Sequence, residues 1–135
     1  MAVEETLAEK VLSFLSRHAE HRAGVRNKWD PALVRHIYDV YCIVKSEPTY
    51  IQRAVSHFKN LVNFDRAEFP HHKSFADDPK QCMASALAAA EEEPQTKREY
   101  QQVLMPLIYS EIKPSFDDAF CEFKAAALVL LETLE

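Results

Sequence analysis

Apolar residues recur at helical spacing along almost the whole chain, and no strand or hairpin pattern interrupts them. The opening stretch is typical, because Leu7, Val11, Phe14 and Leu15 follow the i, i+4, i+7, i+8 spacing of one buried helical stripe. Such stripes with short connections predict an all-α fold, a compact bundle of about six helices in one domain over residues 1–135. With 47% hydrophobic residues, a chain of this length can bury a core without metals or disulfides.

Caps and prolines mark where the predicted helices begin. Asp30-Pro31 and Asp78-Pro79 each place a carboxylate that can cap free amides before a proline that suits the first helical turn. Ser115 stands three residues before an aspartate, which is the spacing of a capping box. Pro94 breaks an alanine-rich helix, and Thr96 is predicted to cap the next one. The predicted helices cover approximately residues 3–21, 31–45, 48–61, 79–93, 97–110 and 116–134.

Four further local features are predicted. Gly24 follows the first helix, where a residue in the left-handed conformation is common. Pro106 is expected to kink or end the helix over 97–110. Residues 62–77 show no clear period and are expected to form a loop held to the core by Phe64, Phe69 and Phe75. The last helix is expected to present one apolar face made of Phe116, Phe120, Phe123, Ala127, Leu130 and Leu134.

The chain contains a single glycine, and this count excludes two kinds of nucleotide-binding site. A G-x-G-x-x-G turn or a P-loop needs several glycines so that the backbone can approach the phosphates. The adjacent His71-His72 lack the i, i+4 spacing of helical zinc ligands, so no metal site is predicted. The spacing of cysteines and histidines also does not identify a cysteine nucleophile with a histidine as its base.

Cysteine usage and hydropathy indicate the compartment. No C-x-x-C spacing and no secretory leader occur, which favours reduced thiols at Cys42, Cys82 and Cys121 in a cytoplasmic protein. The longest apolar run, Ala125 to Leu131, has seven residues and predicts no membrane span.

Charge is distributed unevenly. Between Lys10 and His36 there are six basic residues and two acidic ones, a net charge of +4. Because the whole chain has a net charge of −5, the remaining residues together carry −9. This asymmetry indicates an anionic ligand near the first two predicted helices, although solvated charge patches are common. Arg22, Arg26 and Arg35 are the candidates for contact with a nucleic acid.

Two pairs of charged residues have informative spacing. Lys10 and Arg17 are seven residues apart, so on a helix they point in the same direction, about two turns from each other. Such cations can bind a triphosphate or a nucleic-acid backbone, or they can extend around the core towards solvent. Arg35 and Asp39 are four residues apart and can form a surface ion pair. Asp39 can alternatively contact a hydroxyl-bearing or metal-bound ligand.

Two ordered stretches carry a family resemblance. The first is Ala8-Glu9-Lys10 followed by Ser16-Arg17, and the second is Arg35-His36-Ile37-Tyr38-Asp39-Val40-Tyr41. In this order they resemble the C-terminal helical half of the AbiEii/AbiGii nucleotidyltransferase toxins of bacterial toxin–antitoxin and phage-abortive systems. Three later features also occur in the order in which that family has them: Lys73-Ser74-Phe75, Pro94 and Glu99-Tyr100. The resemblance therefore covers nearly all 135 residues.

The resemblance implies a nucleotidyltransferase fold in which Mg²⁺ supports attack on the α-phosphate of an NTP. It implies modification of the acceptor end of tRNA and restraint by a cognate antitoxin. Residue by residue, Lys10 matches the lysine of the family's third motif, which Ser16 and Arg17 complete as nucleotide-binding residues. Asp39 matches the aspartate of the fourth motif, so Lys10 and Asp39 are the implied catalytic residues. The aspartate would contact a substrate hydroxyl or act as a general base.

The chain also departs from the family pattern. The Gly-Ser turn and the D-x-D metal pair of the family's N-terminal half do not occur, since Asp77-Asp78 and Asp117-Asp118 are adjacent pairs with ordinary helix-start explanations. We therefore expect a truncated or split toxin component, inactive alone and without a cofactor of its own. Mg²⁺ and NTP are expected only with a complementing N-terminal half. The alternative is a non-catalytic helical module that binds an antitoxin or a separate catalytic chain. The first reading predicts that Lys10, Arg17 and Asp39 converge on one basic cleft, with Lys10 and Asp39 in a single hollow. The second predicts an exposed apolar patch where a partner binds.

Overall fold

The computed structural model describes residues 2–24, 33–68, 72–109, 111 and 113–134, and within these ranges every regular element is helical. A turn of π-helix over Tyr100–Leu104 and a turn of 3₁₀-helix over Met105–Leu107 follow the sixth α-helix. The all-α prediction is confirmed. The α-helices of the described part are α1 Val3–Arg22, α2 Leu33–Ser46, α3 Tyr50–Glu68, α4 Lys73–Asp77, α5 Pro79–Glu92, α6 Pro94–Glu99 and α7 Phe116–Glu132.

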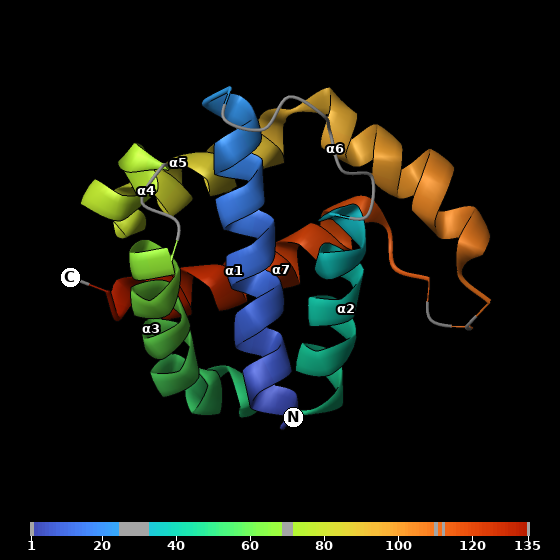
Figure 1. Ribbon diagram of the computed structural model, residues 1–135. Helices are drawn as coiled ribbons and strands as arrows, with labels where there is room; N and C mark the ends of the chain where they lie inside the picture. Colours follow the sequence, from blue (N-terminus) through green and yellow to red (C-terminus); the bar gives the residue numbers. More distant parts are fainter. Residues whose placement is uncertain (1, 25–32, 69–71, 110, 112, 135) are drawn as a thin grey trace.

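Helix α1 is the central element of the bundle. It lies between α2 and α3, and α7 crosses behind it (Figure 1). The predicted stripe is buried, since Leu7, Val11, Phe14 and Leu15 are all fully enclosed. The ring of Phe14 meets that of Phe123 edge to face, with centroids 5.0 Å apart, which joins α1 to α7. Replacing such a buried aromatic ring by alanine costs about 3–5 kcal/mol.

The last helix forms as predicted. The Ser115 hydroxyl accepts a hydrogen bond from the Asp118 backbone N–H at 3.1 Å, so the serine caps the first turn of α7. All six residues of its predicted apolar face are buried, although Leu134 lies just beyond the end of the helix. Tyr100 packs edge to face on Phe116 and donates a hydrogen bond from its hydroxyl to the Pro114 carbonyl at 3.0 Å. These contacts attach the π-helical turn to the bundle.

The prediction of a loop over residues 62–77 is wrong on both sides of residues 69–71, because both described segments are helical. Helix α3 continues to Glu68, because no proline or glycine interrupts it and Val62 extends the buried spacing of Ala54 and Phe58. Phe64 points outward and is 60% exposed, whereas Phe75 is buried as predicted, within α4. Phe69 lies outside the described residues.

Proline chemistry accounts for the other boundaries. Pro94 occupies the first turn of α6, so the buried Thr96 lies inside that helix and does not cap it, contrary to the prediction. Regular α-helix ends at Glu99 and the helical segment ends at Leu107, just after Pro106, as a missing proline N–H predicts. Gly24 has a φ of +78° just beyond α1, which confirms its predicted conformation. The Asp30-Pro31 start lies outside the described residues.

His18 is a buried titratable group at the centre of this packing. It is fully enclosed, its ring stacks on Phe14 at 5.7 Å, and its Nε2 atom lies 3.2 Å from a carboxylate oxygen of Glu93. Burial lowers the pKa of His18, and this effect outweighs the opposing attraction of Glu93. The folded chain therefore binds a proton at His18 less readily than the unfolded chain does.

We predict that His18 makes folding stability depend on pH. Because its folded pKa is below the unfolded value of about 6.5, stability is complete above that pH and falls as the pH drops through it. The free energy of unfolding in urea, measured between pH 7.5 and pH 5, should decrease in the native sequence. It should decrease by less in His18→Phe, which keeps a stacking ring but cannot titrate. An equal decrease in both proteins would contradict this assignment.

Candidate functional site

An ion pair between α1 and α2 brings together the two residues singled out by sequence. The Lys10 ammonium donates a hydrogen bond to Oδ2 of Asp39 at 2.9 Å, across 29 residues of sequence. The side chains are 26% and 22% exposed, so the pair is partly withdrawn from solvent. Helices α1 and α2 position it by packing side by side along their buried faces (Figure 1). This contact confirms that Lys10 and Asp39 lie close together, while the predicted hollow around them and their catalytic roles stay predictions.

A second cation shares the same carboxylate. Nε of Arg35, one turn earlier on α2, lies 3.9 Å from Oδ2 of Asp39, which is the predicted i, i+4 pair. Arg35 is 56% exposed, so water screens this contact and its contribution to stability is at most a few tenths of a kcal/mol. One carboxylate is thus placed between two cations. We call Lys10, Arg35 and Asp39 the charged cluster.

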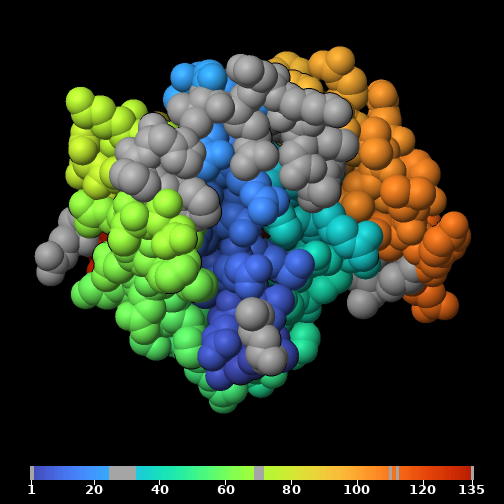
Figure 2. Space-filling model, viewed as in Figure 1, coloured from blue at the N-terminus to red at the C-terminus, as the bar shows by residue number. Residues whose placement is uncertain are grey.

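Arg17 lies farther along the exposed side of α1, in a different electrostatic setting. Figure 2 shows this side of α1 as a strip between α2 and α3. Burial and the negative charge of Glu20 raise the pKa of Asp65 on α3, and the positive charge of Arg17 opposes that rise. Arg17 therefore lies near acidic groups of α1 and α3. Among the described residues of the basic block, Arg17 thus lies apart from Lys10 and Asp39, and these residues do not form one continuous positive stripe.

Ser16, which the family resemblance groups with Lys10 and Arg17 as a nucleotide-binding residue, is buried. On an α-helix it lies about 120° around the axis from Lys10. Its hydroxyl therefore does not share the exposed strip with the charged cluster.

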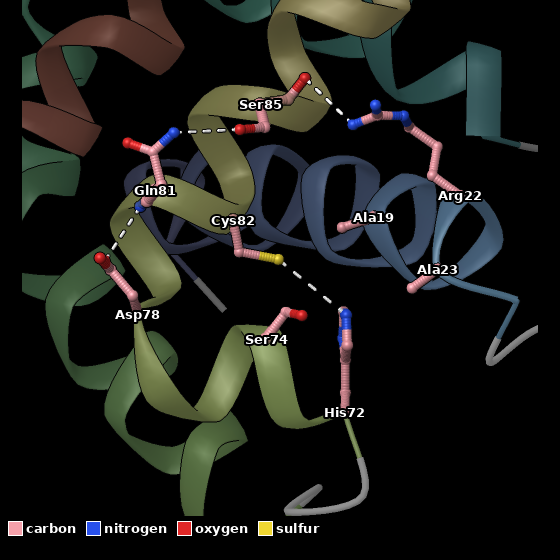
Figure 3. A pocket seen from close by; sticks show the side chains of 9 residues that line it. All are labelled: Ala19, Arg22, Ala23, His72, Ser74, Asp78, Gln81, Cys82 and Ser85. Carbon is pink, nitrogen blue, oxygen red and sulfur yellow. Dashed lines mark hydrogen bonds between the residues drawn. The ribbon is translucent and has the colours of Figure 1, made fainter.

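Arg22 is placed at a separate site. Its guanidinium donates to the Ser85 carbonyl at 3.4 Å, at the end of α1. There it lines a pocket of about 360 Å³ between α1, α4 and α5 (Figure 3). The structure does not bring Arg22 to Lys10 and Asp39, and Arg26 lies outside the described residues.

The same pocket contains a pair of residues that spacing did not reveal. Sγ of Cys82 lies 4.0 Å from Nε2 of His72, and the two groups point toward each other in Figure 3. His72 precedes α4 and Cys82 belongs to α5, so their proximity depends on the turn between these helices. No periodic pattern crosses that turn, which is why the sequence gives no signal for the pair.

Neither metal ligands nor a membrane span emerges from the described ranges. They contain no group of three or more His, Cys, Asp and Glu residues that could hold a metal ion. Asp78 instead accepts a hydrogen bond from the Gln81 N–H at 3.1 Å, and Asp117 lies in the first turn of α7. Among the helices described, none is both long and apolar enough to cross a membrane.

Together, these features define an all-α domain whose chemistry-bearing charges meet across two adjacent helices. A family model described as "Nucleotidyl transferase AbiEii toxin, Type IV TA system" matches residues 1–121. The chain therefore belongs to the AbiEii nucleotidyltransferase toxin family. Membership in a type IV toxin–antitoxin family implies an antitoxin partner. No curated protein and no solved structure matches the chain.

We predict that the Lys10–Asp39 pair couples α1 to α2 only modestly. A double-mutant cycle with Lys10→Met and Asp39→Asn, followed by urea unfolding, should give a coupling free energy of about 1 kcal/mol or less. The exposed pair of Lys124 and Glu91, whose atoms approach to 2.6 Å, is the matched control between α7 and α5. Because solvent screens it more, its coupling should be smaller. A coupling of several kcal/mol at Lys10–Asp39 would show that the pair is primarily structural.

Proposed function

We propose that this chain is the NTP- and RNA-facing helical part of a nucleotidyltransferase toxin, corresponding to the family's C-terminal half. The single observation that carries the proposal is the contact of Lys10 with Asp39, within the segment that the family model matches. A partly buried ammonium held by a carboxylate, with a second cation on the same oxygen, is a preorganised site for an anionic oxygen. The proposed polymer substrate is a tRNA.

In this proposal Lys10 neutralises charge on the phosphates of an NTP. Asp39 holds the ammonium of Lys10 in position, and its second carboxylate oxygen is the one with which it would meet a substrate hydroxyl. Arg35 adds a solvent-exposed cation at the edge of the cluster. Arg17 and Ser16 complete the family motif in sequence, and Arg17 supplies a further cation on the exposed strip, apart from the charged cluster.

The metal chemistry of the reaction does not fit the residues described here. Nucleotidyl transfer uses carboxylates that bring metal ions to the α-phosphate, and the described ranges contain no such group. We therefore propose that Mg²⁺ and catalytic turnover require carboxylates from a complementing N-terminal half, and that these 135 residues alone are inactive. We propose in the same way that the chain is a truncated or split toxin component.

The second candidate function is a non-catalytic module that binds an antitoxin or a separate catalytic chain. It is favoured by exposed apolar side chains on the segment that follows α6, and this segment lies at one edge of the molecule in Figure 2. Val103, Leu107 and Tyr109 are 45%, 60% and 95% exposed. This candidate differs from the first because it gives the charged cluster no part in binding NTP or RNA.

The first prediction concerns RNA affinity. If Lys10 and Arg35 contact phosphates, the slope of log K for tRNA against log salt concentration should be about −2, and Lys10→Gln should reduce its magnitude by about 1. Asp39→Asn should strengthen binding, because it removes the negative charge beside both cations. Filter binding across a salt series measures these slopes. Lys124→Gln on α7 is the control and should change nothing. A Lys10→Gln slope equal to that of the native chain would remove the cluster from RNA binding.

The second prediction concerns catalysis. Alone, the chain should transfer no label from an α-³²P-labelled NTP to tRNA. Addition of an N-terminal segment from an AbiEii family member that carries the Gly-Ser turn and the D-x-D pair should restore labelling. Lys10→Ala and Asp39→Ala together should abolish it. Labelling that survives both changes would exclude a catalytic role for these residues and favour the binding module.

A further inference from the structure

At the end of α1, beside the pocket, a thiol, an imidazole and a carboxylate lie in a row in space. Nε2 of His72 faces Sγ of Cys82 at 4.0 Å, and Nδ1 of the same ring lies 3.9 Å from Oε1 of Glu20 on α1. The three groups come from separate elements, so the packing of α1, α4 and α5 creates the arrangement. It opens onto a cavity of about 360 Å³, which is the size of a small-molecule pocket.

His72 is held in one orientation. Its side chain is almost fully buried and its ring stacks on Phe75 with centroids 5.8 Å apart. A carboxylate only accepts hydrogen bonds, so Glu20 favours the tautomer with its proton on Nδ1. Nε2 is then the acceptor that faces the thiol. The distances are long for hydrogen bonds, as is common in sites without a bound substrate.

The thiol needs such a base. Burial raises the pKa of Cys82, Asp78 and Glu20 add to that rise, and the positive charge of Arg22 opposes it. The thiol is therefore protonated at neutral pH, and its proton must leave as the sulfur attacks. Among the described residues, the charged groups that act on the thiol are Arg22 and Glu20 of α1 and Asp78 before α5, and Asp65 of α3 interacts with Glu20.

We propose that Cys82 is a site of thiol–disulfide exchange with a low-molecular-weight disulfide that enters this pocket. The Cys82 proton passes to Nε2 of His72 while the sulfur bonds to the nearer sulfur of the disulfide. The disulfide bond breaks, and the departing thiolate takes the proton from His72. Cys82 is oxidised to a mixed disulfide and the small molecule is reduced to one free thiol. Glu20 is a positioning residue, and excess free thiol reverses the reaction.

The backbone at the start of α5 does not supply an oxyanion hole beside the thiol. An acyl-transfer site needs hydrogen-bond donors for a developing oxyanion. At the start of α5 the N–H groups of Gln81 and Cys82 are already used, because they donate to the side chain and the carbonyl of Asp78 at 3.1 Å and 3.0 Å. Disulfide exchange places its charge on sulfur and requires no oxyanion hole.

The test is the rate of mixed-disulfide formation with hydroxyethyl disulfide, a small uncharged probe, followed by peptide mass mapping. Cys121 on α7 is exposed and serves as the reference within the same chain, whereas Cys82 is partly buried. Burial alone predicts that Cys121 reacts first. The proposal predicts that Cys82 reacts first at pH 7, and that the two rates become similar when urea unfolds the chain. Faster reaction at Cys121 in the folded chain would overturn it.

Variants separate the base from its surroundings. His72→Phe keeps a ring for stacking on Phe75 and should slow reaction at Cys82 by about tenfold or more, with no change at Cys121. Cys82→Ser should remove the fast adduct. Helicity by circular dichroism shows whether each variant folds, and if His72→Phe does not, Glu20→Gln carries the same test. An unchanged rate at Cys82 in a folded His72→Phe protein would exclude the histidine as the base.

The pH profile tests the positioning role of Glu20. Reaction at Cys82 should depend less steeply on pH than the reaction of a free thiol, because the thiol proton passes to His72 during the step and not to water before it. Glu20→Gln removes the carboxylate that positions the His72 ring, so the rate should fall and the pH profile should move toward that of a free thiol. A purely structural role would change stability without moving this profile. A native profile that rises through about pH 8.5, like that of a free thiol, would contradict the mechanism.

Discussion

The burial of one face of α1 is the constraint on which the rest of the structure depends. Its apolar stripe packs against α2, α3, α5 and α7 at once, with Phe14 on Phe123 at the centre. Only one strip of α1 is then left to carry charge, and Lys10 and Arg17 lie on it. The ammonium of Lys10 can meet Asp39 because α2 packs against one side of that strip. Hydrophobic packing therefore determines where the family's charged residues meet.

Helix positions were largely predictable because they depend on local chemistry. Spacing was enough to predict features that depend on residues within one or two helical turns. These are the buried stripe of α1, the caps at Asp78 and Ser115, and the helix end at Pro106. The errors have the same origin. The third predicted helix ended near Leu61 because residues 62–77 show no clear period, yet α3 continues to Glu68. Its exposed Phe64 is tolerated because Ala54, Phe58 and Val62 already supply the buried face.

The site was less predictable because it depends on contacts between helices. Spacing placed Lys10 and Arg17 on one side of α1 but could not show that Asp65 of α3 lies near Arg17. It could pair Arg35 with Asp39 on one helix, whereas the Lys10–Asp39 contact followed from a family resemblance whose order implied a shared site. The meeting of Cys82 with His72 had no signal at all, since it depends on the turn between α4 and α5.

The distribution of charge limits the kind of anion that the strip can bind. Around Asp39 two cations face one carboxylate, an excess of one positive charge, whereas Arg17 lies near Glu20 and Asp65. At roughly 10 Å, the separation of Lys10 and Arg17 along α1 is about one Debye length in physiological salt, so the two ends act nearly independently. Among the described residues of the strip, the excess positive charge is therefore local to Lys10 and Arg35. Such a field suits one or two phosphate groups, such as those of a nucleotide or an RNA terminus, better than a long stretch of nucleic-acid backbone.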